Sequence, residues 1–429
     1  MVGAHRTTRV PDSTAASRPA LTIRAAAAAA AIACTGAVLL PTAAAPAFAA
    51  GVCGPRITAS LAEPPWAQIR LRPDLAWPLS TGTGVTVAVI DSGVSADHPA
   101  LAGKVLRGRD YLLAQGGDGH CDENGHGTLI AGIIAGREET SAGFRFFGVA
   151  PGAQILPVRV LLDQQRSNDP ALSGRIADAI RWVVDAGHAD VINLSLTTPT
   201  TPGLAAAVQH AIQSDVVVVA AAGNAGDIGT GNGTGQAVYP AAYPGVLAVA
   251  GVDANDQHVS TSTTGPFVDV AAPGLRIAGP SPAGGGYLFA VEGGTSFAAA
   301  YVSGVAALIR GYHPGLSPAQ VSQRITESAQ HPAGQWNPEV GSGVVDPVRA
   351  VGALVPAGAG AGRAAGNASL RIPVVHRSGP SATTVTAVLV AAGSVVVAGL
   401  VLAAVPIMRR GRSRSWRTAG RQRLNQHVT

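Results

Sequence analysis

Two kinds of apolar pattern alternate through residues 81–350, and this alternation restricts the possible folds more than any other feature of the sequence. Short β-branched apolar runs predict buried parallel strands at 85–90, 155–160, 191–194, 216–221 and 246–250. Helix-forming stretches accompany them at 126–136, 171–187, 203–213, 296–310 and 318–329. Such alternation predicts an α/β fold, a three-layer sandwich in which helices cover both faces of a mostly parallel sheet. Sites in such sheets lie at the carboxyl ends of the strands.

The two ends of the chain carry targeting signals. Residues 1–49 predict a secretory signal peptide, because a basic region is followed by an apolar run and the small-residue site Ala47-Phe48-Ala49. An uncleaved anchor helix is the alternative, and the small-residue site argues against it. Residues 382–408 predict one transmembrane helix, since they contain no charge and exceed the ~20 apolar residues that a span needs. The basic tail at 409–429 predicts a cytoplasmic C-terminus and hence an extracytoplasmic domain.

Two connecting segments complete the predicted organisation. Residues 50–80 are rich in Pro and Trp, and we expect them to lie extended over the domain at 81–350. Residues 351–381 are rich in Ala and Gly and predict a flexible linker.

The basic net charge of +5 comes from the ends of the chain. Arginines crowd the first 24 residues and the tail after Met408, which contains no acid, so the middle of the chain is net negative. A nucleic-acid-binding domain needs a basic face, and we therefore expect no nucleic-acid partner.

Two of the three cysteines remain after the predicted signal peptide. In an exported chain, Cys53 and Cys121 favour a disulfide that ties the start of the mature chain to the loop before His126. Two free thiols are the alternative. The nearby acids Asp118, Asp122 and Glu123 predict a solvated acidic loop rather than a calcium site, because their spacing fits no calcium-binding loop. We expect no metal and no cofactor.

Three short motifs suggest nucleophilic catalysis. Asp91 directly follows a predicted strand, His126 lies between two glycines at the start of a predicted helix, and Ser296 opens a predicted helix after a glycine pair. Each residue alone also fits a structural role at a cap or turn. Together they predict a catalytic triad, in which His126 takes the proton of the Ser296 hydroxyl and Asp91 orients and stabilises the imidazole.

A fourth motif predicts the oxyanion hole. The apolar run at 216–222 ends in Gly223-Asn224, where the Asn amide can donate a hydrogen bond to an oxyanion together with the backbone N–H of Ser296. An ordinary turn Asn is the alternative.

The motif order Asp, His, Ser resembles that of the subtilisin-like serine proteases, and the resemblance covers roughly 84–346. It implies a subtilisin-like fold and endopeptidase activity through an acyl-enzyme. It also implies that substrate binds along Ser195, Leu196 and Thr197 and against Ala222 and Gly223.

Further motifs are similar to those of the mycosins, subtilases associated with type VII secretion. They are PWAQ at 65–68, WPLSTG at 77–82 and GTLIAG at 127–132. The likeness implies a membrane-anchored protease beside a type VII secretion complex, with an N-terminal extension that wraps the domain. The sequence departs from that family at Ala300, where a Pro is usual after the nucleophile. A structural component of the complex with dispensable proteolysis is the alternative function.

Overall fold

The computed structural model describes residues 53–113, 115–141, 144–162, 170–227 and 235–353, together with Pro406. The described residues up to 352 form one compact unit. The predicted signal peptide at 1–49 and, apart from Pro406, the predicted membrane helix at 382–408 lie outside the described residues, and both stay predictions. Within the described ranges, no helix is both long and apolar enough for a membrane span.

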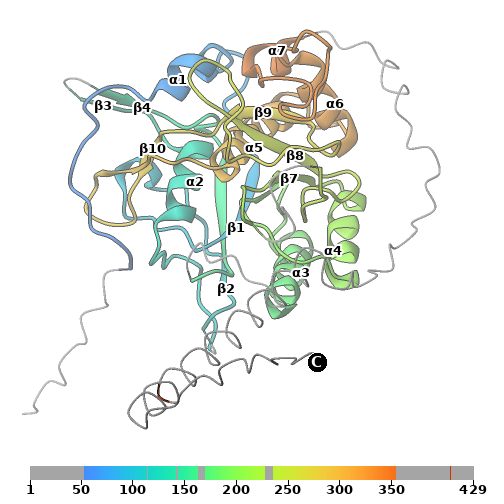
Figure 1. Cartoon of the computed structure of the whole chain (residues 1–429). Helices are drawn as coiled ribbons and strands as arrows, with labels where there is room; N and C mark the ends of the chain where they lie inside the picture. Colours follow the sequence, from blue (N-terminus) through green and yellow to red (C-terminus); the bar gives the residue numbers. More distant parts are fainter. Residues whose placement is uncertain are drawn as a thin grey trace, which may run out of the picture. The chain divides into compact units, whose positions relative to one another are not determined.

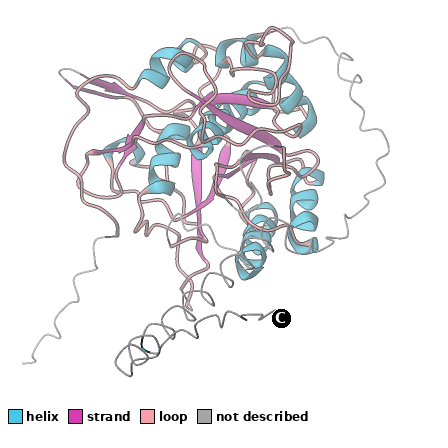
Figure 2. Cartoon of the chain, in the orientation of Figure 1, coloured by secondary structure: helices cyan, strands magenta, loops and turns pink. Residues whose placement is uncertain are grey.

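The centre of the domain is a seven-stranded sheet in which every pair of neighbours is parallel. Its strand order is β2-β5-β1-β6-β7-β8-β9, so the first long strand lies in the interior of the sheet. The strands, magenta in Figure 2, are β1 (Thr86–Asp91), β2 (Arg109–Asp110), β5 (Gln154–Arg159), β6 (Val191–Leu194), β7 (Val217–Ala221), β8 (Leu247–Val252) and β9 (Val270–Pro273).

Helices cover both faces of this sheet, and the alternation of side chains along each strand explains why both faces are apolar. In β1, Val87 and Val89 belong to the core that contains α2 (His126–Ala135) and α5 (Thr295–Tyr312). The intervening Ala88 and Ile90 belong to the core on the other face, with α3 (Pro170–Asp185) and α4 (Pro202–Gln213). The predicted three-layer α/β sandwich with a mostly parallel sheet is therefore confirmed (Figure 1).

The predicted elements match the observed ones within two residues at each end, but several short elements were not predicted. These are α1 (Trp66–Leu71), η1 (Pro73–Leu75), η2 (Pro99–Leu101), β2, β9, α7 (Pro347–Gly352) and two antiparallel pairs, β3 (Glu139–Ser141) with β4 (Phe144–Phe146) and β10 (Ile277–Pro280) with β11 (Tyr287–Ala290). Helix α6 (Pro318–Ser328) follows α5, and its capping box at Ser317 explains its sharp start.

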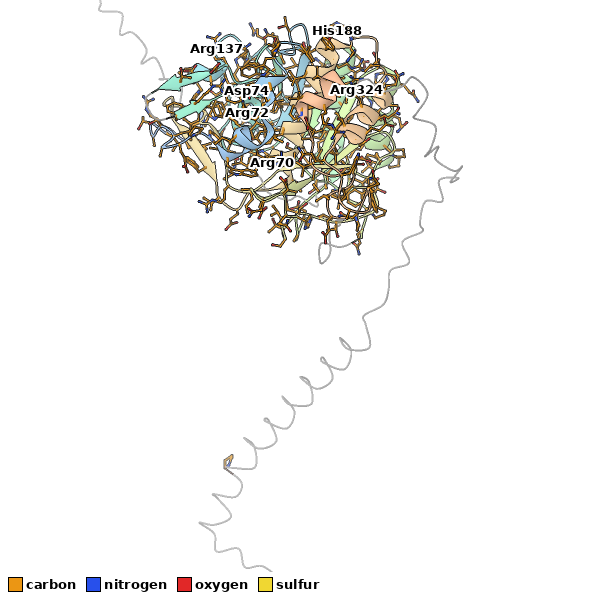
Figure 3. All side chains as sticks on the ribbon, turned by 90° about the horizontal axis from the view of Figure 1, so that it is seen from above. Arg70, Arg72, Asp74, Arg137, His188 and Arg324 are labelled. Carbon is orange, nitrogen blue, oxygen red and sulfur yellow. A yellow bond between two sulfur atoms is a disulfide. The ribbon has the colours of Figure 1, made fainter. Side chains whose placement is uncertain are left out.

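The N-terminal segment 53–80 packs on the domain, though not wholly in the extended form expected. Its first part pairs with the β10–β11 connection: the Ile57 N–H donates to the carbonyl oxygen of Ala283, and the Gly286 N–H donates to the carbonyl oxygen of Ile57, both at 2.9 Å. Helix α1 follows, with Leu71 packed in the core. Arg70, labelled in Figure 3, forms an ion pair with Asp256 at 2.6 Å. The expectation of a purely extended segment was wrong for residues 66–75, because burial of apolar side chains favours a helix there.

Candidate active site

Strand ends and helix starts meet at one edge of the sheet. β1 ends at Asp91, β6 ends just before Ser195, and β7 ends three residues before Asn224. At the same edge α2 begins at His126, and Ser296 is the second residue of α5. Parallel strands present all their carboxyl ends together, so the predicted site residues converge although they are far apart in sequence.

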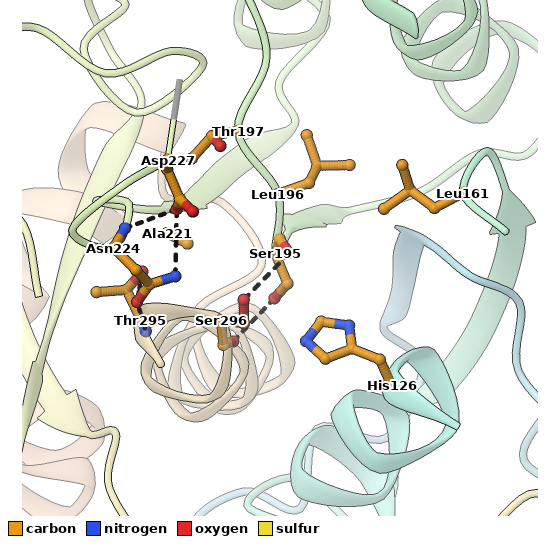
Figure 4. A pocket seen from close by; sticks show the side chains of 10 residues that line it. All are labelled: His126, Leu161, Ser195, Leu196, Thr197, Ala221, Asn224, Asp227, Thr295 and Ser296. Carbon is orange, nitrogen blue, oxygen red and sulfur yellow. Dashed lines mark hydrogen bonds between the residues drawn. The ribbon is translucent and has the colours of Figure 1, made fainter. Parts of the chain in front are cut away.

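Asp91 and His126 form a buried pair. Nδ1 of His126 lies 2.8 Å from Oδ1 of Asp91, and the two residues are 7% and 0% exposed. Gly127 makes this approach possible, because a Cβ at that position would lie 2.1 Å from the carbonyl oxygen of Gly93. Figure 4 shows the imidazole with a ring nitrogen turned toward Ser296.

The carboxylate changes the acidity of the imidazole. Burial by itself lowers the pKa of His126, but the negative charge of Asp91 and its hydrogen bond outweigh burial, with a further contribution from Asp122. The net result is a pKa above the usual value of 6.5. A more basic imidazole is a stronger proton acceptor, as general-base chemistry requires.

Asp122 connects the segment after Asp91 to the start of the helix that carries His126. Its Oδ1 accepts from the Ser92 hydroxyl and the Gly125 N–H, both at 2.8 Å. Its Oδ2 accepts from the N–H (2.8 Å) and the hydroxyl (2.6 Å) of Thr128. The residue is fully buried, and burial raises its pKa despite these four donors. The expected solvated acidic loop was therefore wrong for Asp122, whose carboxylate ties the end of β1 to the start of α2.

The residue before Asp122 is covalently fixed. Cys53 and Cys121 form a disulfide, as predicted, which closes a sequence separation of 68 residues. The bridge anchors the N-terminal segment to the loop that carries Asp122. Within the described ranges, no cluster of three or more His, Cys, Asp or Glu side chains could hold a metal ion.

Ser296 lies in the first turn of α5, next to the loop that begins at Ser195. Its hydroxyl donates to the carbonyl oxygen of Ser195 at 3.2 Å, while the Ser195 hydroxyl donates back to the Ser296 carbonyl oxygen at 2.8 Å. The hydroxyl is thus directed to the Ser195 strand end rather than hydrogen-bonded to His126. Backbone N–H groups in the first turn of a helix have no partner within the helix, so the N–H of Ser296 is available to an anion.

The side chain of Asn224 is held at both ends. Its Oδ1 accepts from the Thr295 N–H at 3.0 Å, and its Nδ2 donates to Oδ2 of Asp227 at 3.2 Å (Figure 4). Gly223, with φ of 96°, makes the turn that follows β7.

One pocket brings most of the predicted site residues together. It is lined by His126, Leu161, Ser195, Leu196, Thr197, Ala221, Asn224, Asp227, Thr295 and Ser296 (Figure 4). Ala222 and Gly223, also predicted to bind substrate, are not among the lining residues, and Ala222 is fully buried. Sequence reasoning missed four lining residues, Leu161, Ala221, Asp227 and Thr295; Thr295 and Ala221 had a signal, as the immediate neighbours of the predicted Ser296 and Ala222. A serine hydroxyl and a carboxylate-paired imidazole in one pocket, at the carboxyl edge of a parallel α/β sheet, are the arrangement typical of a serine hydrolase of the subtilisin class.

Comparison with known proteins agrees with this class. The subtilase family model of S8 peptidases matches residues 82–349. Mycosin-1 of Mycobacterium tuberculosis is 39% identical over 79% of this chain and 84% of its own length. The crystal structure of MycP1 from the ESX-1 type VII secretion system aligns with a TM-score of 0.62 and 33% identity over 71% of this chain and 91% of that one. A chain of the intact ESX-5 inner membrane complex aligns with a TM-score of 0.58 and 34% identity over 81% and 90% of the two chains.

The chain belongs to the subtilase family and is a serine endopeptidase of the mycosin type.

Proposed function

We propose that Asp91, His126 and Ser296 are the catalytic triad of this peptidase. The buried 2.8 Å contact between Asp91 and His126, with Ser296 on the same pocket, carries the proposal. The Ser296 hydroxyl leaves the Ser195 carbonyl by rotation about χ1, which moves a side chain between staggered positions, and turns to Nε2 of His126.

The reaction then follows from the roles of these groups. Nε2 of His126 takes the hydroxyl proton as Oγ of Ser296 bonds to the peptide carbonyl carbon, and Asp91 stabilises the imidazolium. His126 returns the proton to the leaving amine, the C–N bond breaks and an acyl-enzyme remains. Water then attacks the acyl carbon while His126 takes its proton. The bond between this carbon and Oγ of Ser296 breaks, the carboxylic acid leaves, and His126 returns the proton to Ser296. The negative oxygen of each tetrahedral intermediate is stabilised by Nδ2 of Asn224 and the N–H of Ser296.

The substrate is an extended polypeptide. The loop at Ser195, Leu196 and Thr197 directly follows β6 and lines the pocket, which supports pairing of its backbone with a substrate strand. We propose that Leu161 and Leu196 contribute apolar surface beside it.

Labelling with a fluorophosphonate tests the triad. The wild-type protein should label, whereas Ser296→Ala and His126→Ala should not, because one lacks the nucleophile and the other its base. Ser317→Ala is a matched control, since Ser317 also stands at a helix start but does not line the pocket. A folded wild-type protein that fails to label, or labelling that persists in Ser296→Ala, contradicts the assignment.

We also propose that the protein is anchored by one C-terminal membrane helix with its catalytic domain outside the cytoplasm, beside a type VII secretion complex. The predicted signal peptide, the predicted span at 382–408 and the arginine-rich tail support the topology. The likeness to a chain of the ESX-5 inner membrane complex supports the partner. Protease protection in sealed vesicles whose cytoplasmic face is inside tests the topology. The C-terminal tail should be protected there, and digestion of the tail by protease added outside contradicts the proposal.

A structural role in the complex is the alternative, and the same structural likeness favours it. Ser296→Ala separates the two. If secretion continues while substrate processing stops, the scaffold role is independent of catalysis; if both stop in a stably produced variant, proteolysis is the function.

A further inference from the structure

We propose that Asp227 is a positioning residue that holds the amide of Asn224 in the orientation needed to stabilise the oxyanion. The inference rests on the proposed role of Asn224 and names the residue through which that role is maintained.

Hydrogen bonds to Thr295 and Asp227 fix the Asn224 side chain and its backbone. The Thr295 N–H donates to Oδ1 at 3.0 Å, which determines which end of the amide is the donor. At the other end, Nδ2 donates to Oδ2 of Asp227 at 3.2 Å. The same carboxylate oxygen accepts from the backbone N–H of Asn224 at 2.7 Å. One carboxylate therefore controls both the backbone and the amide plane, as the dashed lines in Figure 4 show.

This arrangement leaves one donor for the reaction. An Asn amide has two N–H bonds on Nδ2, and Asp227 occupies one of them. The second is then fixed in direction, because the amide is planar and both of its ends are bonded. Donors that are already oriented before reaction are the ones that stabilise a developing charge without reorganisation.

Asp227 is suited to this task by its environment. It is 8% exposed, and its hydrogen bonds to N–H groups are charge-assisted, so they are stronger than bonds between neutral groups. It also closes the turn after Asn224, since its own N–H donates to the Asn224 carbonyl oxygen at 2.9 Å. Its position three residues after Asn224 brings the carboxylate back to the amide.

Asp227 also lines the pocket, which suggests a rival role. A carboxylate in a substrate pocket can select a cationic side chain at the residue before the cleaved bond. That role depends on the substrate side chain and not on Asn224. A purely structural turn role would instead alter stability and leave the rate of each folded active site unchanged.

A double-mutant cycle on the full chain separates these roles. The variants are Asp227→Ala, Asn224→Ala and the double variant, with kcat and KM measured on peptides that place Leu or Lys before the cleaved bond. The concentration of active sites is measured by fluorophosphonate titration, so that unfolded protein does not lower the value of kcat. Asp253→Ala is the matched control, because Asp253 also accepts two backbone N–H bonds in a turn but does not line the pocket.

We expect Asp227→Ala to lower kcat about tenfold on both peptides with little change in KM, a part of the ~10²–10³ lost with a whole oxyanion donor. Asp227→Asn, which keeps a neutral acceptor, should restore most of that rate. In the Asn224→Ala background the effect of Asp227→Ala on kcat should vanish.

Three results would overturn the inference. One is an equal loss of kcat in the Asn224→Ala background, and another is a loss confined to the Lys peptide and to KM. The third is an unchanged kcat in Asp227→Ala. Failure of the underlying site is recognised separately: if Asn224→Ala itself leaves kcat unchanged, the proposed oxyanion hole is wrong, and Asp227 cannot act through it.

Discussion

Replacing Asp122 by Asn should destabilise the domain more than any change in its exposed acidic neighbours. The carboxylate accepts four hydrogen bonds, two on each oxygen. An Asn side chain keeps one oxygen and turns an NH₂ group toward the other two donors, in either orientation. Two lost bonds to a charged group cost about 1.5–3 kcal/mol each, and relief from burying a charge offsets part of this. The net loss should be about 2–4 kcal/mol in the free energy of unfolding.

Urea unfolding followed by tryptophan fluorescence measures this loss, in a Ser296→Ala background that prevents self-digestion. Asp118→Asn is the matched control, because Asp118 lies in the same loop with a side chain that is 42% exposed. It should change the free energy of unfolding by less than about 0.5 kcal/mol. In the otherwise native protein, Asp122→Asn should also lower kcat, because β1 and α2 lose their shared anchor. Equal unfolding midpoints for the two variants would refute the reasoning.

Two further predictions follow from the same region. Because Asp91 raises the pKa of His126, kcat/KM should rise with pH to a plateau, with a midpoint above 6.5. The reason is that the imidazolium present at lower pH cannot accept the Ser296 proton. A midpoint at or below 6.5 contradicts this prediction. Replacing Cys53 and Cys121 together by Ser removes a cross-link between residues 68 positions apart, so the unfolded chain gains conformational entropy. This should lower the free energy of unfolding by about 4 kcal/mol. An unchanged urea midpoint would show that the bridge contributes nothing.

The architecture was predictable because its signals are local and repeated. Runs such as 216–221 are apolar on both faces, which indicates a strand buried between two layers, and the observed β7 has this environment. The short antiparallel pairs gave no such signal. β3 and β4 have three residues each, too few for a period-two pattern to stand out from chance. The helix α1 was missed because its neighbouring prolines indicate extended chain.

The site was only partly predictable, for a physical reason. Asp91, His126 and Ser296 stand in local contexts that suggest chemistry by themselves, directly after a strand or at the start of a helix. Asp122 and Asp227 have ordinary loop contexts. Their importance comes from burial and from partners that the fold brings to them, such as Ser92 and Asn224. A charged residue in a loop is usually solvated, and sequence alone does not show which carboxylate the fold will enclose.

The N-terminal segment shows how a surface element can support a site without entering it. Residues 53–80 are covalently linked at Cys53 to the loop before Asp122, and their backbone pairs with the β10–β11 connection beside α2. None of the ten pocket-lining residues belongs to this segment. Direct blockage of the active site would need residues in the pocket, and residues 53–80 contribute none of its lining. Its attachments instead restrict the loop that carries Asp122, and through that carboxylate the relative position of Asp91 and His126.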